Sequence, residues 1–440
     1  MTVPRTGPES LPAPAPRTAL RRNPEYLRWL LGDLLLDAGT GIGAFAFPLV
    51  TYMVTEDLGT TGLVALVQGL GALVGLIPGG LLADRVERRR LRLLAGAIGA
   101  LLQAVLVIVL LTGAAGAVVL AVLAFADRFR ETLLGSASNA MLKQLVPTAQ
   151  LPRAVSVNQG RQAAVEMASG PVGGALLGLS IVFPPLAQLL GNLGSVIATL
   201  SMRRRYHPRT ASAVRTKVSE DLREALGWTI SQPLRLQILA IASSVNLGAN
   251  GLIFAVLLDL ASDGVPATRI GLLNTVLAAA ILLGAFLAPR LVDTVPTGVL
   301  AIAPVMLMAL VGVFLATGPS MLLIGAAYAV LGIGIPAINA SSQGFFTHIT
   351  PVAMQGRVSS LMRVVSSSLM PLAPAMAGWG LDLVGLMPTM LVFAGVLALG
   401  ALAGLLGRDL RRIPTAPQWE RYAREEGLAV DEEEAPPAGG

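Results

Sequence analysis

The stretch GGLLADRVERRR at residues 79–90 lies between two long apolar runs, at residues 60–83 and 91–112. Small residues end the first run, and residues 84–92 then hold five arginines and two carboxylates before the second run is established. About 20 apolar residues are enough for a helix to cross the hydrocarbon core of a bilayer. The stretch therefore predicts a short charged loop that joins two membrane helices.

The composition of the whole chain agrees with a membrane protein. It is 54% hydrophobic and 13% charged, whereas soluble domains are about 25% charged. With no cysteine, disulfides, zinc–thiolate sites and thiol nucleophiles are excluded. The first ~25 residues contain Pro and Arg without a short apolar core, so we expect no removable signal peptide.

The hydropathy pattern predicts an all-α membrane protein with twelve transmembrane helices. The fourth and fifth spans carry charges, and the fifth and sixth are barely separated, so these are the least distinct. The twelve spans lie near residues 27–54, 60–83, 91–112, 116–141, 156–178, 181–202, 236–260, 267–290, 297–317, 320–343, 357–380 and 385–407.

The distribution of positive charge predicts the orientation. If both termini are cytoplasmic, the cytoplasmic segments hold 27 of the 32 Lys and Arg residues, as the positive-inside rule requires. Because these cations lie beside the spans, the net charge of +6 indicates topology and contact with anionic lipid headgroups, and no nucleic-acid partner. We expect a multi-pass protein of the cell (cytoplasmic) membrane.

The two halves of the chain align at an offset of 203–205 residues, which indicates an internal repeat. Residues 83–85 align with 288–290, residues 147–156 with 351–360, and residues 170–174 with 373–377. The chain therefore divides into two six-helix pseudo-repeats, with a substrate path expected between them. The expected parts are a disordered cytoplasmic tail (1–24), an N-terminal bundle (25–202), a central cytoplasmic loop with an amphipathic helix (203–235), a C-terminal bundle (236–407) and a charged cytoplasmic tail (408–440), for which solvated disorder is expected.

The loop after the second span resembles the signature of the major facilitator superfamily, and the resemblance extends over residues 25–408. The matching positions are Gly80, Leu82, Asp84, Arg85, Arg88 and Arg89, with Glu87 where the family usually has Gly. The resemblance implies a cytoplasmic gate in which Asp84 caps a neighbouring helix and pairs with the loop arginines. The alternative is that these charges only fix topology.

Two further motifs are similar to those of drug:proton antiporters. Gly170, Pro171 and Gly174 resemble the helix-kink motif of that group, although Ala175 replaces its final glycine. The loops around residues 145–147 and 355–358 are most like those of macrolide-efflux and siderophore-export proteins. The resemblance implies proton-coupled efflux by a monomer.

Ionisable residues inside the spans indicate a functional site, because each costs about 2.5–3.5 kcal/mol or more in a membrane. Helix depth places carboxylates of the first, fourth and fifth spans at a similar level. We hypothesise that they bind and release a proton while Arg128 or Arg130 tunes them; permanent ion pairs that only lock helices together are the alternative. The proton-coupling candidates are Asp37, Asp127, Glu131, Glu166 and Asp33, with Arg128, Arg130 and Arg161 as charge partners.

Three of the charged residues have a second interpretation based on depth. Asp33 is equally compatible with extension towards the cytoplasmic surface, and Arg161 and Arg363 are shallow enough to contact headgroups. The C-terminal half offers amides, which either line the substrate path or join helices by hydrogen bonds. These substrate-path candidates are Asn246, Asn250, Asn274, Asn339 and Gln343.

The chain has no phosphate-binding loop, no metal-ligand pattern and no Ser/His/Asp constellation, so we expect no cofactor, no metal and no enzyme activity. Together these features predict a secondary active transporter that exports a small amphipathic molecule of drug, macrolide or siderophore type. An importer on the same fold and a non-transporting membrane receptor or assembly partner are the alternatives.

Overall fold

The computed structural model describes residues 20–203, 218–351 and 354–428; the greater part of the predicted N-terminal tail, much of the central loop and the end of the C-terminal tail lie outside them. Among these residues, helices occupy the positions of all twelve predicted spans, and the eleventh is divided into α12 and α13. The helices are α1 (Pro24–Thr55), α2 (Leu58–Arg85), α3 (Arg88–Leu111), α4 (Ala117–Leu145), α5 (Leu151–Leu179), α6 (Phe183–Leu200), α7 (Val218–Ile230), α8 (Pro233–Ser262), α9 (Ala267–Thr294), α10 (Thr297–Leu315), α11 (Met321–His348), α12 (Gln355–Ser368), α13 (Leu372–Val384), α14 (Leu386–Leu406), α15 (Arg408–Arg412) and α16 (Trp419–Glu425).

Within the described residues, ten of the spans are long and apolar enough to be membrane helices on composition alone. The other two are α4 and α5, the charged spans that the sequence makes least distinct. Their charges lower the mean hydropathy of each helix. Three of these charged residues, Asp127, Arg130 and Arg161, have partners inside the N-terminal half.

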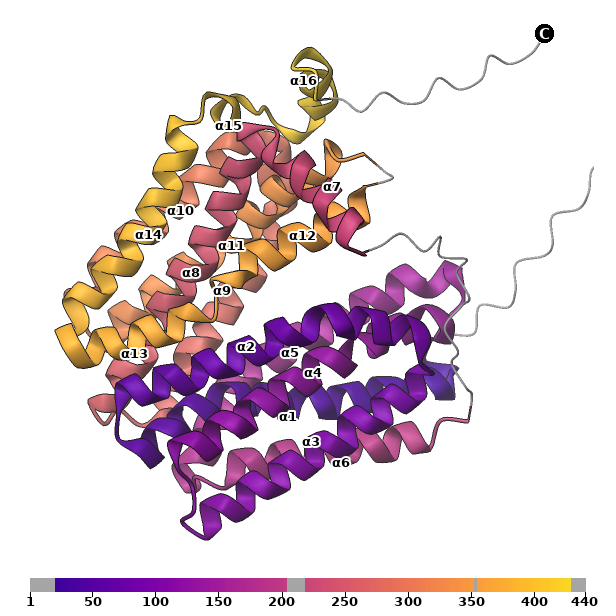
Figure 1. Cartoon of the computed structure of the whole chain (residues 1–440), viewed down its shortest axis with the longest axis vertical. Helices are drawn as coiled ribbons and strands as arrows, with labels where there is room; N and C mark the ends of the chain where they lie inside the picture. The colour runs from indigo at the N-terminus through magenta and orange to yellow at the C-terminus, as the bar shows by residue number, and fades with distance from the viewer. Residues whose placement is uncertain (1–19, 204–217, 352–353, 429–440) are drawn as a thin grey trace, which may run out of the picture.

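The six helices of each half pack in the same way, which supports the internal repeat. In the N-terminal half α1 packs on α5 and α6, α2 on α4, and α3 on α4 and α6. In the C-terminal half α8 packs on α13 and α14, α9 on α11, and α10 on α11 and α14. Figure 1 shows the two bundles side by side at α2 and α13 and diverging towards the end that carries α7.

Glycines bring the halves together at one end of the molecule. We call this end the far end, because α1 begins at the opposite end, where α7 and α16 also lie. On α5, a Cβ added to Gly170 would lie 2.5 Å from the carbonyl oxygen of Gly271 on α9. On α2, a Cβ added to Gly62 would lie 2.4 Å from the carbonyl oxygen of Pro374 on α13. Only hydrogen fits at these positions, so glycine permits the two helix pairs to touch through their backbones.

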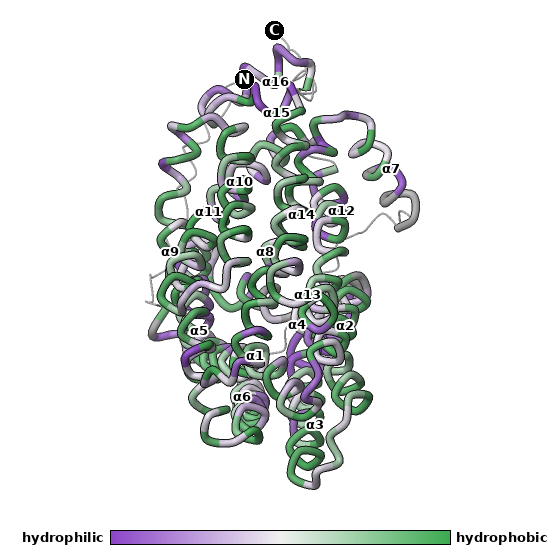
Figure 2. The backbone as a smooth tube through the Cα atoms, turned by 90° about the vertical axis from the view of Figure 1, so that its left-hand side faces the viewer, coloured by the Kyte–Doolittle hydropathy of each residue, from purple (hydrophilic) through white to green (hydrophobic). Residues whose placement is uncertain are grey.

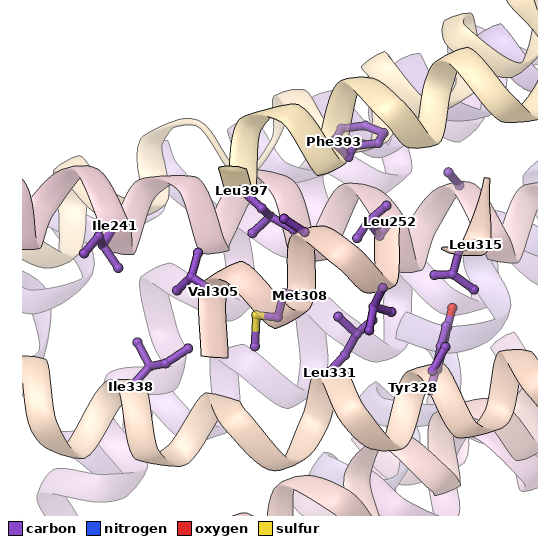
Figure 3. Close-up of a cluster of buried hydrophobic side chains, with 14 of the residues drawn as sticks. Ile241, Leu252, Val305, Met308, Leu315, Tyr328, Leu331, Ile338, Phe393 and Leu397 are labelled. Carbon is purple, nitrogen blue, oxygen red and sulfur yellow. The ribbon is translucent and has the colours of Figure 1, made fainter. Parts of the chain in front are cut away.

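The two halves differ in the polarity of their interiors. The C-terminal half is built on an apolar cluster from α8, α10, α11 and α14 (Figure 3). The N-terminal half instead buries charged and amide side chains, among them Asp33, Arg92, Arg130 and Gln188. Figure 2 shows hydrophobic residues over much of the length of both bundles and hydrophilic ones gathered at α15 and α16. Among the described residues, three of the four buried charged residues therefore belong to the N-terminal half, and the fourth, Arg235, lies at the start of α8.

Three segments differ from the sequence-based expectations. Residues 408–428, expected to be solvated, fold onto the C-terminal half: Ile413 is buried, and the indole of Trp419 donates to the Thr297 hydroxyl (2.9 Å). The eleventh span breaks at 369–371 because Pro371 has no N–H to continue the helix. By contrast, α5 continues as one helix through Pro171 of the predicted kink motif.

Candidate transport site

A cavity of about 880 Å³ lies between the two halves. Helices α1, α2, α4 and α5 form one wall, and α8, α9, α12 and the start of α13 form the other. Its volume is in the range of small-molecule sites, which are usually 300–1,000 Å³. Five charged side chains line it: Asp37, Arg128, Glu131, Glu166 and Arg363. The structure thus brings three of the five predicted carboxylates to one cavity.

Asp37 is held at the cavity wall by an arginine from the neighbouring helix. Its carboxylate lies 2.7 Å from Nη2 of Arg161, and about a third of the Asp37 side chain is exposed. The same Arg161 nitrogen lies 3.5 Å from Oδ2 of Asp33, and it also donates to Oδ1 of Asn158 (2.8 Å). The sequence predicts Arg128 or Arg130 as the tuning partner of this carboxylate, but the cation beside Asp37 is Arg161.

Asp33 belongs to a buried network and does not extend to the surface. It is 5% exposed, and its carboxylate pairs with Arg92 on α3. The hydroxyl of Ser138 on α4 donates to the same carboxylate (2.6 Å) and accepts from the Trp29 indole (3.0 Å). The side chain of Arg161 is only 7% exposed, so neither residue extends to the surface, where the depth argument allowed contact with headgroups. The burial follows from partners on α1, α3, α4 and α5, which compensate both charges.

The charges of α4 form two pairs, each between residues three apart. Arg128 pairs with Glu131 (2.6 Å) on the cavity side. Arg130, 4% exposed, pairs with Asp127 (2.9 Å), whose second oxygen accepts from the Gln188 amide of α6 (3.0 Å). Asp127 and Arg130 therefore lie inside the N-terminal bundle, outside the lining of the central cavity.

The predicted amides of the C-terminal half divide into three groups. Asn250 and Asn274 line the cavity. Asn246 donates to the backbone oxygen of Ser366 (3.0 Å) and so joins α8 to α12. Asn339 and Gln343 are exposed on α11 and are not part of the cavity lining.

Sequence reasoning does not find the position of Arg363. The sequence suggests contact with headgroups, but the residue lies on α12 in the cavity wall. The sequence also places Arg92 among the loop cations, whereas it lies in α3 and pairs with Asp33. If the third predicted span were extended to include the basic residues before it, it would begin four residues before Arg92, as α3 does. Arg92 would then be predicted to lie inside a membrane helix.

Comparison with known proteins identifies the architecture. Residues 34–239 match the family model described as Major Facilitator Superfamily. A search of curated protein sequences finds no match. The chain has the major facilitator fold.

Solved structures of transporters share this fold over nearly their whole length. The nucleoside transporter NupG, in the form of a point mutant, is 14% identical with a TM-score of 0.74, covering 87% of this chain and 99% of that one. A bacterial homologue of the iron transporter ferroportin in an inward-facing state is 15% identical (TM-score 0.68), covering 88% of this chain and 99% of that one. A bacterial homologue of the lysosomal transporter Spinster, in an inward-facing and unoccupied conformation, is 17% identical (TM-score 0.65), covering 88% and 97%. These matches show that the chain shares its fold with these transporters.

The signature loop of the major facilitator fold has ordinary backbone geometry here. Glu87, where the superfamily usually has Gly, has a φ of −55°, so the turn does not require a glycine. Its side chain pairs with Arg90 (3.0 Å). Arg89 donates to the backbone oxygens of Thr199 (3.3 Å) and Leu200 (3.1 Å), which satisfies carbonyls at the end of α6.

The remaining members of the predicted gate lie at the same end of α2 and α3. Gly80 and Arg85 are exposed, and Arg88 begins α3. The side chain of Asp84 lies outside the described part of the structure. The gate accordingly remains a prediction from the family resemblance.

Proposed function

We propose that the protein exports a small amphipathic molecule in exchange for protons, by alternating access of its two halves. In this proposal the chain is a monomer in the cytoplasmic membrane with both termini in the cytoplasm. The clustering of Lys and Arg in the terminal, central and short connecting segments supports that orientation. The far end, where α5 meets α9 and α2 meets α13, then faces outward, and the cavity is accessible from the cytoplasm.

The Asp37–Arg161 pair at the cavity wall is the main observation that supports proton coupling. Asp37 is both partly exposed to the cavity and in contact with a buried cation. A carboxylate in this position can exchange a proton with the water of the cavity. Its charge also affects the packing of α5 against α1, because its partner Arg161 lies on α5. Asp33 and Asp127 also pair with arginines, but neither lines the central cavity.

Asp33 lowers the free-energy cost of protonating Asp37, because it remains a partner for Arg161. Removing one partner of a buried ion pair usually costs about 3–5 kcal/mol, because the remaining charge is uncompensated. When Asp37 becomes neutral, Arg161 still lies near the second oxygen of Asp33 and still donates to Asn158. The arginine therefore keeps partners in both states, and Asp37 is free to cycle.

The experiment is flux in proteoliposomes under an imposed pH gradient, with macrolides, siderophores and cationic dyes as the panel. For one proton exchanged per uncharged substrate, a gradient of one pH unit supports about a tenfold concentration ratio at equilibrium. Accumulation on the acidic side beyond that in protein-free liposomes identifies proton-coupled export, whereas protein-dependent accumulation on the alkaline side identifies an importer. Folded protein that moves no compound would favour the receptor alternative.

Asp37→Asn tests the role of the carboxylate, and Asp382→Asn on the exposed face of α13 is the matched control. We expect the Asp37 variant to equilibrate substrate without following the pH gradient, while the control keeps the tenfold ratio. If the Asp37 variant still follows the gradient, the proton is carried elsewhere, and Glu131 and Glu166 become the next residues to substitute.

A further inference from the structure

We propose that the transported molecule is ambipolar, with a cationic group that binds Glu166 and an anionic group that binds Arg363. This inference rests on the proposed transport function and specifies its substrate class. It starts from the charges of the cavity wall. Of the five charged lining residues, three are neutralised within the N-terminal half, by the Asp37–Arg161 and Arg128–Glu131 pairs.

The two remaining charges face the cavity without compensation. Within residues 20–203, 218–351 and 354–428, neither Glu166 nor Arg363 has an ion pair or a side-chain hydrogen bond. Both side chains belong to exposed residues of the cavity wall. Polar groups that converge on an apolar pocket without internal partners are those that orient a ligand.

The two charges come from opposite halves of the molecule. Glu166 lies on α5 and Arg363 on α12, and the halves touch farther along the chain from each, where Gly170 meets α9 and Pro371 meets Gly69. A molecule that pairs with both residues connects the two halves. Closure of the cavity removes water from both charges, and an unpaired charge in that state is costly. A ligand with one charge leaves one of the two residues without a partner.

The surface between the charges suits an apolar body with a few hydrogen-bonding groups. Phe254, Leu257 and Leu277 supply apolar contacts, and Asn250 and Asn274 supply amides. The volume of 880 Å³ admits a drug-sized molecule. The substrate class is thus a compact apolar scaffold with an amine-type cation and a carboxylate-type anion.

Binding of matched probes to the full chain in gradient-free nanodiscs tests this inference. Rhodamine B carries both charges, its ethyl ester only the cation, and fluorescein only anionic charge; the dissociation constants follow from fluorescence polarisation. A second scaffold is the dipeptide Phe-Phe with its methyl ester and its N-acetyl form, measured by thermal shift. We expect the zwitterion of at least one scaffold to bind about tenfold more tightly than either single-charge form.

Two substitutions assign each charge to its residue. Glu166→Gln should remove the preference for the zwitterion over the anion, and Arg363→Gln should remove its preference over the ester. Arg363→Lys should retain the preference for the zwitterion, and Asp382→Asn should change nothing.

Three results would overturn the proposal. They are equal or tighter binding of the single-charge forms, no binding by the zwitterion of either scaffold, and uniform weakening of every probe in both glutamine variants. The last would show that Glu166 and Arg363 act on the equilibrium between conformations. Because no pH gradient is present, failure here is separate from failure of the Asp37 flux experiment.

Discussion

Gly170→Ala and Gly271→Ala should push the halves apart at the far end. An alanine Cβ at position 170 would lie 2.5 Å from the Gly271 carbonyl oxygen, and one at position 271 would lie 2.2 Å from the Gly170 oxygen. Ordinary contacts of this kind are about 3.5 Å, so α5 and α9 must separate by about 1 Å. Both obstructing atoms belong to the backbone, and no side-chain rotamer relieves the clash.

The size of the effect follows from the cost of overpacking. Forcing extra methyl groups into a close contact costs about 1–3 kcal/mol. If that cost falls only on the state in which the far end is closed, the equilibrium shifts about five- to 150-fold towards the state in which it is open. Gly178→Ala is a matched control on the same helix, since its Cβ would meet only the Thr268 hydroxyl at 3.6 Å.

Double electron–electron resonance distances measure the shift directly. The chain has no cysteine, so Leu179→Cys and Leu383→Cys, both exposed near the far end, give a uniquely labelled pair across the two halves. We expect the longer-distance population to grow in the two interface variants and to stay unchanged in the Gly178 control. Identical distance distributions in all three variants would refute the argument that this contact closes the far end.

Three further predictions concern local stability. Trp419→Ala should lower the free energy of unfolding by about 1–3 kcal/mol, through loss of the ring contacts and of the hydrogen bond to Thr297, and should speed proteolysis of the C-terminal segment. Arg92→Met should lower the free energy of unfolding by about 3 kcal/mol, the low end of the range for a broken buried pair, since a second arginine remains near Asp33; a lowered thermal midpoint would show this. Asp57 caps α2, and hydrogen bonds from the side chain and the backbone N–H of Thr60 hold its pKa below the usual value of about 3.9. The contribution of this cap, about 1 kcal/mol, is therefore complete at neutral pH and disappears as the pH falls through the lowered pKa. Urea titrations of Asp57→Ala and wild type should accordingly converge in acid.

The spans and the position of three carboxylates could be predicted from the sequence because both depend on local quantities. Hydropathy gives the length of each helix, and the rise of about 1.5 Å per residue converts position into depth. This is why Asp37, Glu131 and Glu166, on three different helices, meet at one cavity. The two ion pairs of α4 are also local, since their partners are three residues apart.

The partners of Asp33 and Asp37 could not be predicted because they depend on helix packing. Arg92 and Arg161 are separated from these carboxylates by 59 or more positions, and no spacing in the sequence links them. The position of Arg363 in the cavity wall likewise depends on how α12 packs, and no spacing in the sequence shows it. The fold of segment 408–428 could not be predicted because its few apolar anchors, Ile413 and Trp419, have no helical periodicity.

The polar interior of the N-terminal half has a consequence for biogenesis. The two helices that fall short as independent membrane spans, α4 and α5, carry the charges that later pair with α1, α3 and α6. A nascent α5 whose Arg161 has not yet paired with Asp33 and Asp37 of α1 enters lipid poorly on its own, and so does a nascent α4 with its four charges at residues 127–131. The first three helices must therefore remain close to the translocon until α4 to α6 emerge, so that the N-terminal half enters the bilayer as one assembled unit.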